Sequence, residues 1–433
     1  MKRNLLITIL SLVGVSACAF GLAACNNSDT SVHTHKWSQT WDNDETHHWH
    51  NCTASGCDIT DNSQKDGYTE HDISSGECVC GYKPDFTIGL QYQLHPYNGD
   101  SYLVDGIGTA KDKAIIIPSV YEGKPVTGID FNAFKNCNNL TSITIPDSVT
   151  EIGDSAFSGC SNLASITIPD SVTVISNKAF EDCTSLTSIT IPNSVTGIGY
   201  GVFNGCSSLT SIALPNGIHD IVANMFSGCI SLASINIPDS VTTIGGAAFD
   251  GCSSLTSINI PDGVKIIAGS AFKNCSSLTS TTIPDSVTKI YSSAFNGCSS
   301  LTNVTIQSGE TFIDSNVFDG CPIETATIPA SACSYINNSA LKSVVITSGE
   351  VMYGNAFKDC SNLTSITIAD SVTRIGDEAF LNCTNLTSIT FNGTKEQWNA
   401  IEIGSNWSYN TGDFTVHCTN GNIVDQPNST KSN

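Results

Sequence analysis

The sequence is short of charge, and above all of positive charge. Charged residues make up 13% of the 433 residues, and 18 lysines and arginines stand against 40 aspartates and glutamates, a formal net charge of -22. Nucleic acid and anionic lipid are both bound chiefly through Lys and Arg side chains. We therefore expect no nucleic-acid partner and a thinly charged, solvated outer surface.

Catalytic motifs are also missing. The chain has no G-x-S-x-G elbow, no phosphate-binding loop, no G-x-G-x-x-G after a strand and no H-E-x-x-H pair. One repeated unit occupies most of the chain and leaves little room for an enzyme domain. We expect no enzymatic activity.

The first 24 residues have the composition of an export signal. A basic start is followed by an apolar run and small residues, and no other segment is apolar enough to span a bilayer. The run ends in Leu-Ala-Ala-Cys, which resembles a bacterial lipobox. That resemblance implies cleavage before Cys25, a diacylglycerol on its thiol, and a polar tether over 25–31. The alternative is a conventional secretion signal cut near Ala19.

A 23-residue repeat dominates the rest of the chain. Each unit reads Ala-Phe, a small turn, Cys, then Leu-x-x-Ile-x-Ile-Pro and Val-x-x-Ile, as in "AFSGCSNLASITIPDSVTVIS" from Ala156. Its cysteines recur at a constant spacing of 23 residues at 137, 160, 183, 206, 229, 252, 275, 298 and 321, and again at 360 and 383.

Such a unit predicts one coil of a repeat solenoid. Leu163, Ile166 and Ile168 alternate with polar residues and are expected to point inward, whereas Thr167 points outward. Pro169 ends the strand because it has no N–H for the ladder. One coil cannot bury its own apolar face, so the coils must stack and be capped.

The expected fold is therefore an array of about 12 coils, each with one short β-strand and an irregular, 3-10 or helical return. It is divided into an N-terminal cap over 85–129, coils over 130–401, and a C-terminal cap with a polar tail over 402–433. At the strand spacing of about 4.8 Å the array would extend roughly 55–60 Å.

The repeat resembles the BspA-like, Treponema-type leucine-rich repeat of bacterial surface antigens. "YLVDGIGTAKDKAIIIPSVYEGKPVTGI" resembles the opening cap of such arrays, and "FNGTKEQWNAI" resembles their closing element. The cysteine precedes the strand by three residues, and the Asn/Cys ladder of the commoner leucine-rich repeat is missing. The resemblance implies a cell-surface location and a role in adhesion or macromolecular interaction.

The register breaks once, over 322–359, where 39 residues separate Cys321 from Cys360. This segment is either a decayed repeat, which we favour, or a binding site. Elsewhere the repeated cysteines lack a recurring His or Asp partner, so we interpret them as core residues. The repeated Asp after the strand is interpreted as a turn cap, with calcium binding as the alternative.

The outward strand positions carry short hydroxyls and amides, with almost no charge and no aromatic anchors. Tight protein-binding hot spots favour Trp, Tyr and Arg. The face therefore suits many weak contacts, to a glycan or an extended chain, or is inert scaffold. The candidate binding residues are Thr144, Thr167, Thr190, Asn236, Asn259 and Thr305.

Residues 32–84 form a separate head rich in Cys, His and Trp. A module of this size with few aliphatic residues usually needs a disulfide or a metal to fold. The candidate ligands of one structural zinc are Cys52, Cys57, Cys78, Cys80, His47, His50 and His71. "GECVCGY" resembles the CxxCGY end of zinc-ribbon-like modules, shortened by one residue.

Other ways of stabilising the head remain open. Export favours disulfides, although the many unpaired array cysteines point to a reducing environment. Histidine-mediated haem or metal binding and an unstapled Trp/His docking patch are further alternatives.

We thus expect a monomeric, lipid-anchored protein of the bacterial cell surface that binds a host or bacterial protein or glycan through the array. The alternative function is capture of zinc or haem by the head, with the array as a stalk.

Overall fold

The computed structural model describes residues 85–97, 99–336 and 338–424, together with the backbone of three short head strands. The chain divides into two compact units, Met1–Ile88 and Gly89–Asn433. In the first, β1 (Asp42–Asn43), β2 (His47–His50) and β3 (Asp66–Glu70) form a small antiparallel sheet in the order β1-β2-β3.

The second unit begins with a cap of paired strands. β4 (Gln91–Leu94) runs antiparallel to β5 (Tyr102–Gly106), β5 pairs in parallel with β8 (Lys124–Ile129), and β7 (Val120–Tyr121) is antiparallel to β8. Because β8 then pairs in parallel with the first coil, the cap covers the open end of the core.

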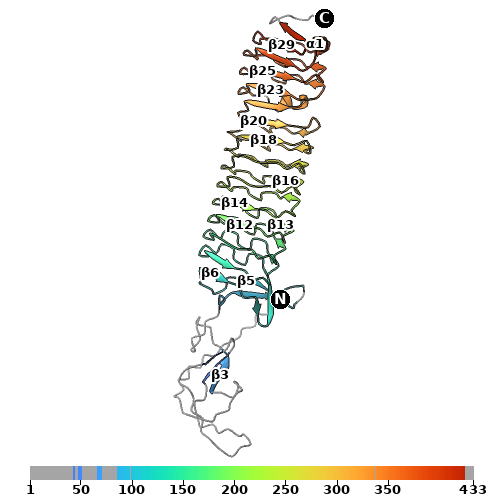
Figure 1. The fold of residues 1–433 in the computed structure, drawn as a ribbon. Helices are drawn as coiled ribbons and strands as arrows, with labels where there is room; N and C mark the ends of the chain where they lie inside the picture. Colours follow the sequence, from blue (N-terminus) through green and yellow to red (C-terminus); the bar gives the residue numbers. More distant parts are fainter. Residues whose placement is uncertain are drawn as a thin grey trace, which may run out of the picture. The chain divides into compact units, whose positions relative to one another are not determined.

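The coils stack so that two parallel ladders run along the array (Figure 1). The first ladder, formed by the predicted strands, contains β6 (Ala114–Ile116), β9 (Ser142–Thr144), β12 (Ser188–Thr190), β14 (Ser211–Ala213), β18 (Ser280–Ile283), β20 (Asn303–Ile306), β22 (Thr325–Ile328), β23 (Ser343–Ile346), β25 (Ser365–Ile368), β27 (Ser388–Phe391) and β29 (Thr415–Cys418).

The second ladder lies on the returns. It contains β10 (Glu151–Ile152), β11 (Val174–Ile175), β13 (Gly197–Ile198), β15 (Asp220–Ile221), β16 (Thr243–Ile244), β17 (Ile266–Ile267), β19 (Lys289–Ile290), β21 (Phe312–Ile313), β24 (Val351–Met352), β26 (Arg374–Ile375) and β28 (Glu402–Ile403).

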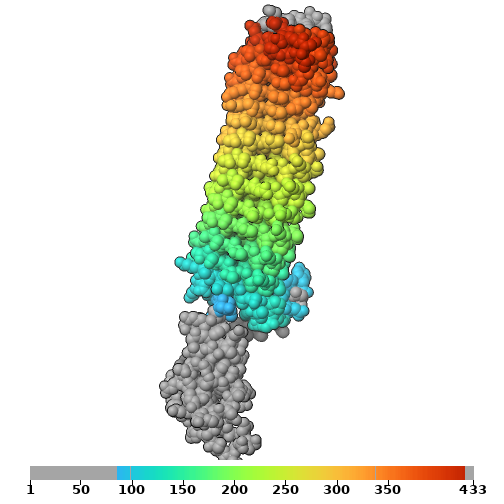
Figure 2. Space-filling model, viewed as in Figure 1, coloured from blue at the N-terminus to red at the C-terminus, as the bar shows by residue number. Residues whose placement is uncertain are grey.

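The predicted solenoid is confirmed, with two differences. It has about 14 turns where we expected 12 coils, because the caps stack as turns of their own. Most coils also carry a second strand on the return, where the sequence predicted an irregular segment. Figure 2 shows the coils as a continuous column of stacked layers.

The core is filled by rows of identical side chains, one from each coil. Leu163, Ile166, Ile168, Val172 and Ile175 are all buried, as the alternation predicts, and Thr167 is exposed. A row of phenylalanines from Phe134 to Phe318 stacks face to face, with ring centroids 5.0–5.8 Å apart.

The repeated cysteines are part of this core, and none of the thirteen in the described part of the array forms a disulfide. The thiol of Cys183 donates to the carbonyl of Phe157 at 3.2 Å, and the same bond links Cys206 to Phe180 at 3.1 Å. Each such thiol thus satisfies a buried carbonyl of the preceding coil, which explains why a small, weak donor recurs there.

The irregular segment over 322–359 shortens one coil without breaking the first ladder. β22 pairs in parallel with β23 at Thr325↔Ser343, 18 residues apart. The 3-10 helix η2 (Ala330–Tyr335) stands between β21 and β24, so the second ladder and the phenylalanine stack stop there. Cys333 of η2 is buried in the core, in keeping with a packed, shortened repeat.

The array closes with a short helix and a hairpin. α1 (Lys395–Ala400) begins at a capping box in which Thr394 and Gln397 bond each other's backbone. Its Trp398 packs edge to face on Phe391 and near Trp407. β29 and β30 (Gly421–Val424) are antiparallel and end the first sheet.

Candidate interaction surface

The outward residues of the first ladder make one continuous surface, which we call the strand face. Strand alternation places two columns on it. One column runs through Ser142, Ser165, Ser188, Ser211, Ser234, Ser257, Ser280, Asn303, Thr325, Ser343, Ser365, Ser388 and Thr415; the other through Thr144, Thr167, Thr190, Ala213, Asn236, Asn259, Thr282, Thr305, Thr327, Val345, Thr367, Thr390 and His417.

All six candidate binding residues lie in the second of these columns. Thr144, Thr167, Thr190, Asn236 and Asn259 are exposed, and Thr305 is half-buried. In the described part of the chain their side chains make no hydrogen bond, so their donors and acceptors face solvent. The geometry therefore brings these residues together as one row.

The strand face carries no Asp, Glu, Lys or Arg in either column, although the whole chain has a net charge of -22. The opposite surface differs. The outward residues of the second ladder, which we call the return face, include Glu151, Asp220, Lys289, Arg374 and Glu402. The two columns thus offer mainly groups capable of neutral hydrogen bonding, and acidic side chains lie on the return face and in the turns that follow the strands, as Asp262 does.

The threonine hydroxyls beside the strand face have a structural role. The threonine that follows the repeated leucine donates to a carbonyl of the preceding coil, as Thr210 does to Thr187 at 3.1 Å and Thr387 to Thr364 at 3.2 Å. These side chains hold the stack together and are engaged as donors.

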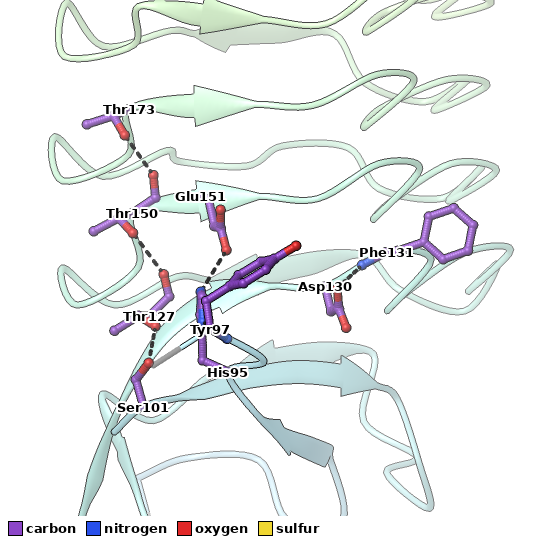
Figure 3. Close-up of polar contacts among 9 residues, drawn as sticks. All are labelled: His95, Tyr97, Ser101, Thr127, Asp130, Phe131, Thr150, Glu151 and Thr173. Carbon is purple, nitrogen blue, oxygen red and sulfur yellow. Dashed lines mark hydrogen bonds and ion pairs between the residues drawn. The ribbon is translucent and has the colours of Figure 1, made fainter. Parts of the chain in front are cut away.

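The N-terminal end of the return face carries a second cluster of polar contacts (Figure 3). Thr173 donates to the carbonyl of Thr150, and Thr150 to that of Thr127, at 3.3 and 3.2 Å. The Nε2 atom of His95 lies 3.6 Å from a carboxylate oxygen of Glu151, beside the fully exposed Tyr97.

The hydrogen bond from Thr150 to Thr127 and the contact between His95 and Glu151 join the cap to the first coil. Two aromatic side chains, Tyr97 and Phe131, stand exposed there at 93% and 60%.

The buried thiols of Cys160, Cys229 and Cys383 are poorly suited to nucleophilic chemistry. Burial raises the pKa of Cys160, Cys229 and Cys383 to about 12, so their thiolate form is disfavoured at neutral pH. None of the described residues forms a cluster of three or more His, Cys, Asp or Glu able to hold a metal ion.

The candidate residues of the head stand apart from these findings. His47 and His50 lie on β2, opposite Glu70 and Asp66 of β3. Cys25, Cys52, Cys57, Cys78, Cys80 and His71 lie outside the described residues. Zinc ligation and lipidation therefore stay predictions.

Sequence reasoning missed one feature of the strand face. The inward position between its two columns is aliphatic in twelve coils, but in one coil it is Thr281. Thr281 is 4% exposed and its hydroxyl has no hydrogen-bond partner. This single polar exception was visible in the sequence, whereas the lack of a hydrogen-bond partner for its hydroxyl was not.

Within the described residues, no helix is long and apolar enough to serve as a membrane span.

Comparison with known proteins gives the family. The model of the BspA type leucine-rich repeat region (6 copies) matches residues 127–245, 219–347 and 350–420. Together these segments cover about two-thirds of the chain. No curated protein matches the chain significantly.

The solved structures that are similar include the following three. A leucine-rich repeat protein from Bacteroides ovatus is 26% identical, with 77% of this chain and 100% of that chain covered and a TM-score of 0.49. A leucine-rich cell surface protein from Faecalibacterium prausnitzii is 31% identical, with 74% and 97% covered and a TM-score of 0.45. The leucine-rich repeat protein of T. pallidum is 30% identical, with 54% and 86% covered and a TM-score of 0.34.

The 23-residue coils, the strand ladder and the match over most of the array agree with the resemblance found in the sequence, and the chain belongs to the BspA-type leucine-rich repeat family.

Proposed function

We propose that this protein is a cell-surface adhesion or interaction protein that binds a host or bacterial macromolecule through the strand face. The observation that carries the proposal is the uncharged strand face of an otherwise acidic protein. A partner that docks there by hydrogen bonds leaves no charge buried without a counter-ion, which is the costly case in an interface. The family supports the same role, because leucine-rich repeat arrays are in general binding scaffolds.

The strand face also suits many contacts of modest strength. It lacks Trp, Tyr and Arg, the residues that dominate tight protein–protein hot spots. Affinity would instead accumulate along the array, since each coil presents the same hydroxyls and amides to a long partner. Such repetition favours an extended macromolecule over a compact one.

The proposal predicts that charge introduced on the strand face will weaken binding, whereas charge introduced on the return face will not. The full chain is tested by surface plasmon resonance on a panel of immobilised extracellular-matrix proteins and polysaccharides. A double variant, Thr167→Arg with Thr190→Arg, is expected to lower binding at least tenfold, because it places two bulky cations on the strand face.

The matched control puts the same cations on the return face, as Val174→Arg with Thr243→Arg, and is expected to bind like the parent protein. Equal losses from both double variants, or no binding to any member of the panel, would contradict the proposal.

We further propose that Cys25 carries the lipid that attaches the protein to the membrane. Two or three acyl chains hold a protein firmly at a bilayer, whereas one chain binds reversibly. Cys25→Ser is expected to move the protein from the detergent-extracted membrane fraction to the soluble fraction, and to prevent metabolic labelling with an alkyne fatty acid. Retention of label in the variant would exclude Cys25 as the lipidated residue.

A further inference from the structure

The return face carries exposed aromatic rings where the second ladder is interrupted. Ile266 of β17, Lys289 of β19 and Phe312 of β21 are paired in register and stand in one outward column of adjacent strands. Tyr291 lies beside this column and directly follows β19. Together with Lys265 these residues form what we call the return-face patch. The patch differs from the strand face, which has no Phe, Tyr or Trp in either column.

The interruption of the ladder leaves these rings open to solvent. β21 is the last strand of its five-stranded sheet, and η2 follows in place of a return strand. Among the described strands, none stacks on the far side of Phe312, which is 56% exposed, and Tyr291 is 36% exposed. Aromatic rings that cluster on a surface are typical of interaction sites, because burying them on association is favourable.

Lys289 lies over both rings. Its Nζ atom is 4.2 Å from the ring centroid of Tyr291 and 5.4 Å from that of Phe312, which is within the range of a cation–π contact. This contact holds a flexible side chain beside the rings but does not neutralise its charge. A partner would therefore meet a positioned ammonium group together with aromatic surface.

Neither lysine of the patch has a counter-ion in the described part of the chain. By contrast, Lys178, Lys342 and Lys358 each form an ion pair with a glutamate, at 2.8–3.0 Å. Lys265 is exposed and Lys289 is half-buried. Both ammonium groups are thus available to a negatively charged group of a partner.

Acidic side chains are scarce around the patch. This part of the return face is made by the stretches 242–247, 265–270, 288–293 and 311–316. Their one acidic residue is Asp314, whose carboxylate already accepts from the backbone N–H of the next residue at 2.8 Å. Two lysines against one aspartate give this section an excess of positive charge, although the whole chain has a net charge of -22.

We infer that the return-face patch binds a protein segment that presents a carboxylate beside an aromatic or aliphatic side chain. The carboxylate is complementary to the two ammonium groups, and the apolar side chain is complementary to Ile266 and to the rings of Tyr291 and Phe312. Tyrosine is also one of the residues that dominate binding at protein interfaces. The patch lies outside the strand face, so this inference goes beyond the proposed function and does not depend on it.

A sulphated glycan is a poorer partner for the patch. Such a polymer carries charge on most of its units, and the net charge of -22 repels it. A protein segment can instead place one carboxylate among apolar side chains. That arrangement matches two lysines set beside three apolar residues.

The test selects random peptides displayed on phage against the immobilised full chain, with counter-selection on the Lys289→Glu variant. The enriched peptides are expected to carry Asp or Glu next to Phe, Tyr, Trp or Leu. The most enriched peptide, synthesised with a fluorescein label, is then the probe for fluorescence polarisation. Added salt should weaken its binding, because the charges of the patch are accessible to solvent.

Two matched pairs of variants locate the site of the probe. Lys289→Glu is expected to weaken binding at least tenfold, whereas Lys135→Glu, the same change at an exposed lysine of the first coil, should leave it unchanged. Phe312→Ser is expected to weaken binding several-fold, because it removes one ring. Tyr200→Ser, at an exposed ring beside the second ladder, should leave binding unchanged.

Two further measurements separate binding from folding and from the strand face. Urea unfolding of Lys289→Glu and Phe312→Ser should match that of the parent, since both side chains lie on the surface. The double variant Thr167→Arg with Thr190→Arg should bind the probe as the parent does.

The inference is overturned if no peptide distinguishes the parent from Lys289→Glu, if the enriched peptides lack acidic residues, or if each control variant loses as much affinity as its partner. Tighter binding of heparin than of the probe, lost in Lys289→Glu, would also overturn it. Binding of the strand face to the panel of macromolecules is measured separately, so either proposal can fail while the other stands.

Discussion

Replacing Ile189 with Asp is expected to unfold several coils of the array and to lower the free energy of unfolding by at least about 4 kcal/mol. Ile189 is 4% exposed and pairs with Ile212 of the next coil. The substitution removes a packed aliphatic side chain and places a carboxylate in the core, where no cation of the first ladder can reach it. Each coil is stabilised mainly by its neighbours, so the defect spreads to both sides.

The matched control is Thr190→Asp, which introduces the same carboxylate one residue later on the same strand. Thr190 is exposed on the strand face, so its change in unfolding free energy should stay below about 1 kcal/mol. Urea unfolding followed by circular dichroism, with limited proteolysis, compares the two variants. Losses of equal size would mean that the assignment of Ile189 as an inward residue and Thr190 as an outward residue is wrong.

The contrast between these two residues marks what the sequence could predict. The alternation Leu-x-x-Ile-x-Ile and its recurrence every 23 residues were enough for the solenoid, the inward rows and the strand face. The reason is physical: a one-residue error in register would expose every isoleucine of the ladder, so the pattern tolerates only one orientation.

The second ladder was not predicted because its strands are too short to show a pattern. β11 consists of Val174 and Ile175 alone, and two residues cannot display the alternation by which a strand is recognised. These strands arise from stacking: once the first ladder fixes the spacing of the coils, the returns come within hydrogen-bonding distance of each other.

The unpartnered hydroxyl of Thr281 could not be predicted from the sequence for a related reason. Threonine has a high β propensity and fits a strand, so the residue alone does not distinguish a buried, unpartnered hydroxyl from an ordinary strand position. The six residues of the candidate binding column were found from alternation because their orientation is a local property.

Raising the pH above 9 is expected to destabilise the reduced array steeply, because its buried thiols must stay protonated. Burial raises the pKa of Cys160, Cys229, Cys275, Cys360 and Cys383 to about 12, against an ordinary value of 9.0. Between pH 9 and 12 the unfolded chain loses these protons and the folded chain keeps them. Stability is therefore fully present below pH 9 and is lost as the pH rises towards 12.

The change of the unfolding free energy with pH can be assigned to the thiols by replacing these cysteines one at a time. Each such cysteine contributes up to about 1.4 kcal/mol per pH unit in this window. Urea unfolding in reductant at pH 8, 9.5 and 10.5 should show a smaller loss for Cys229→Ala than for the parent, by about that amount per unit. Cys418→Ala, at a half-buried thiol outside the core row whose pKa burial also raises, should reduce the loss by less than Cys229→Ala does. If both variants keep the parent slope, the loss of stability at high pH has another source. The buried thiols then need not stay protonated for the array to remain folded.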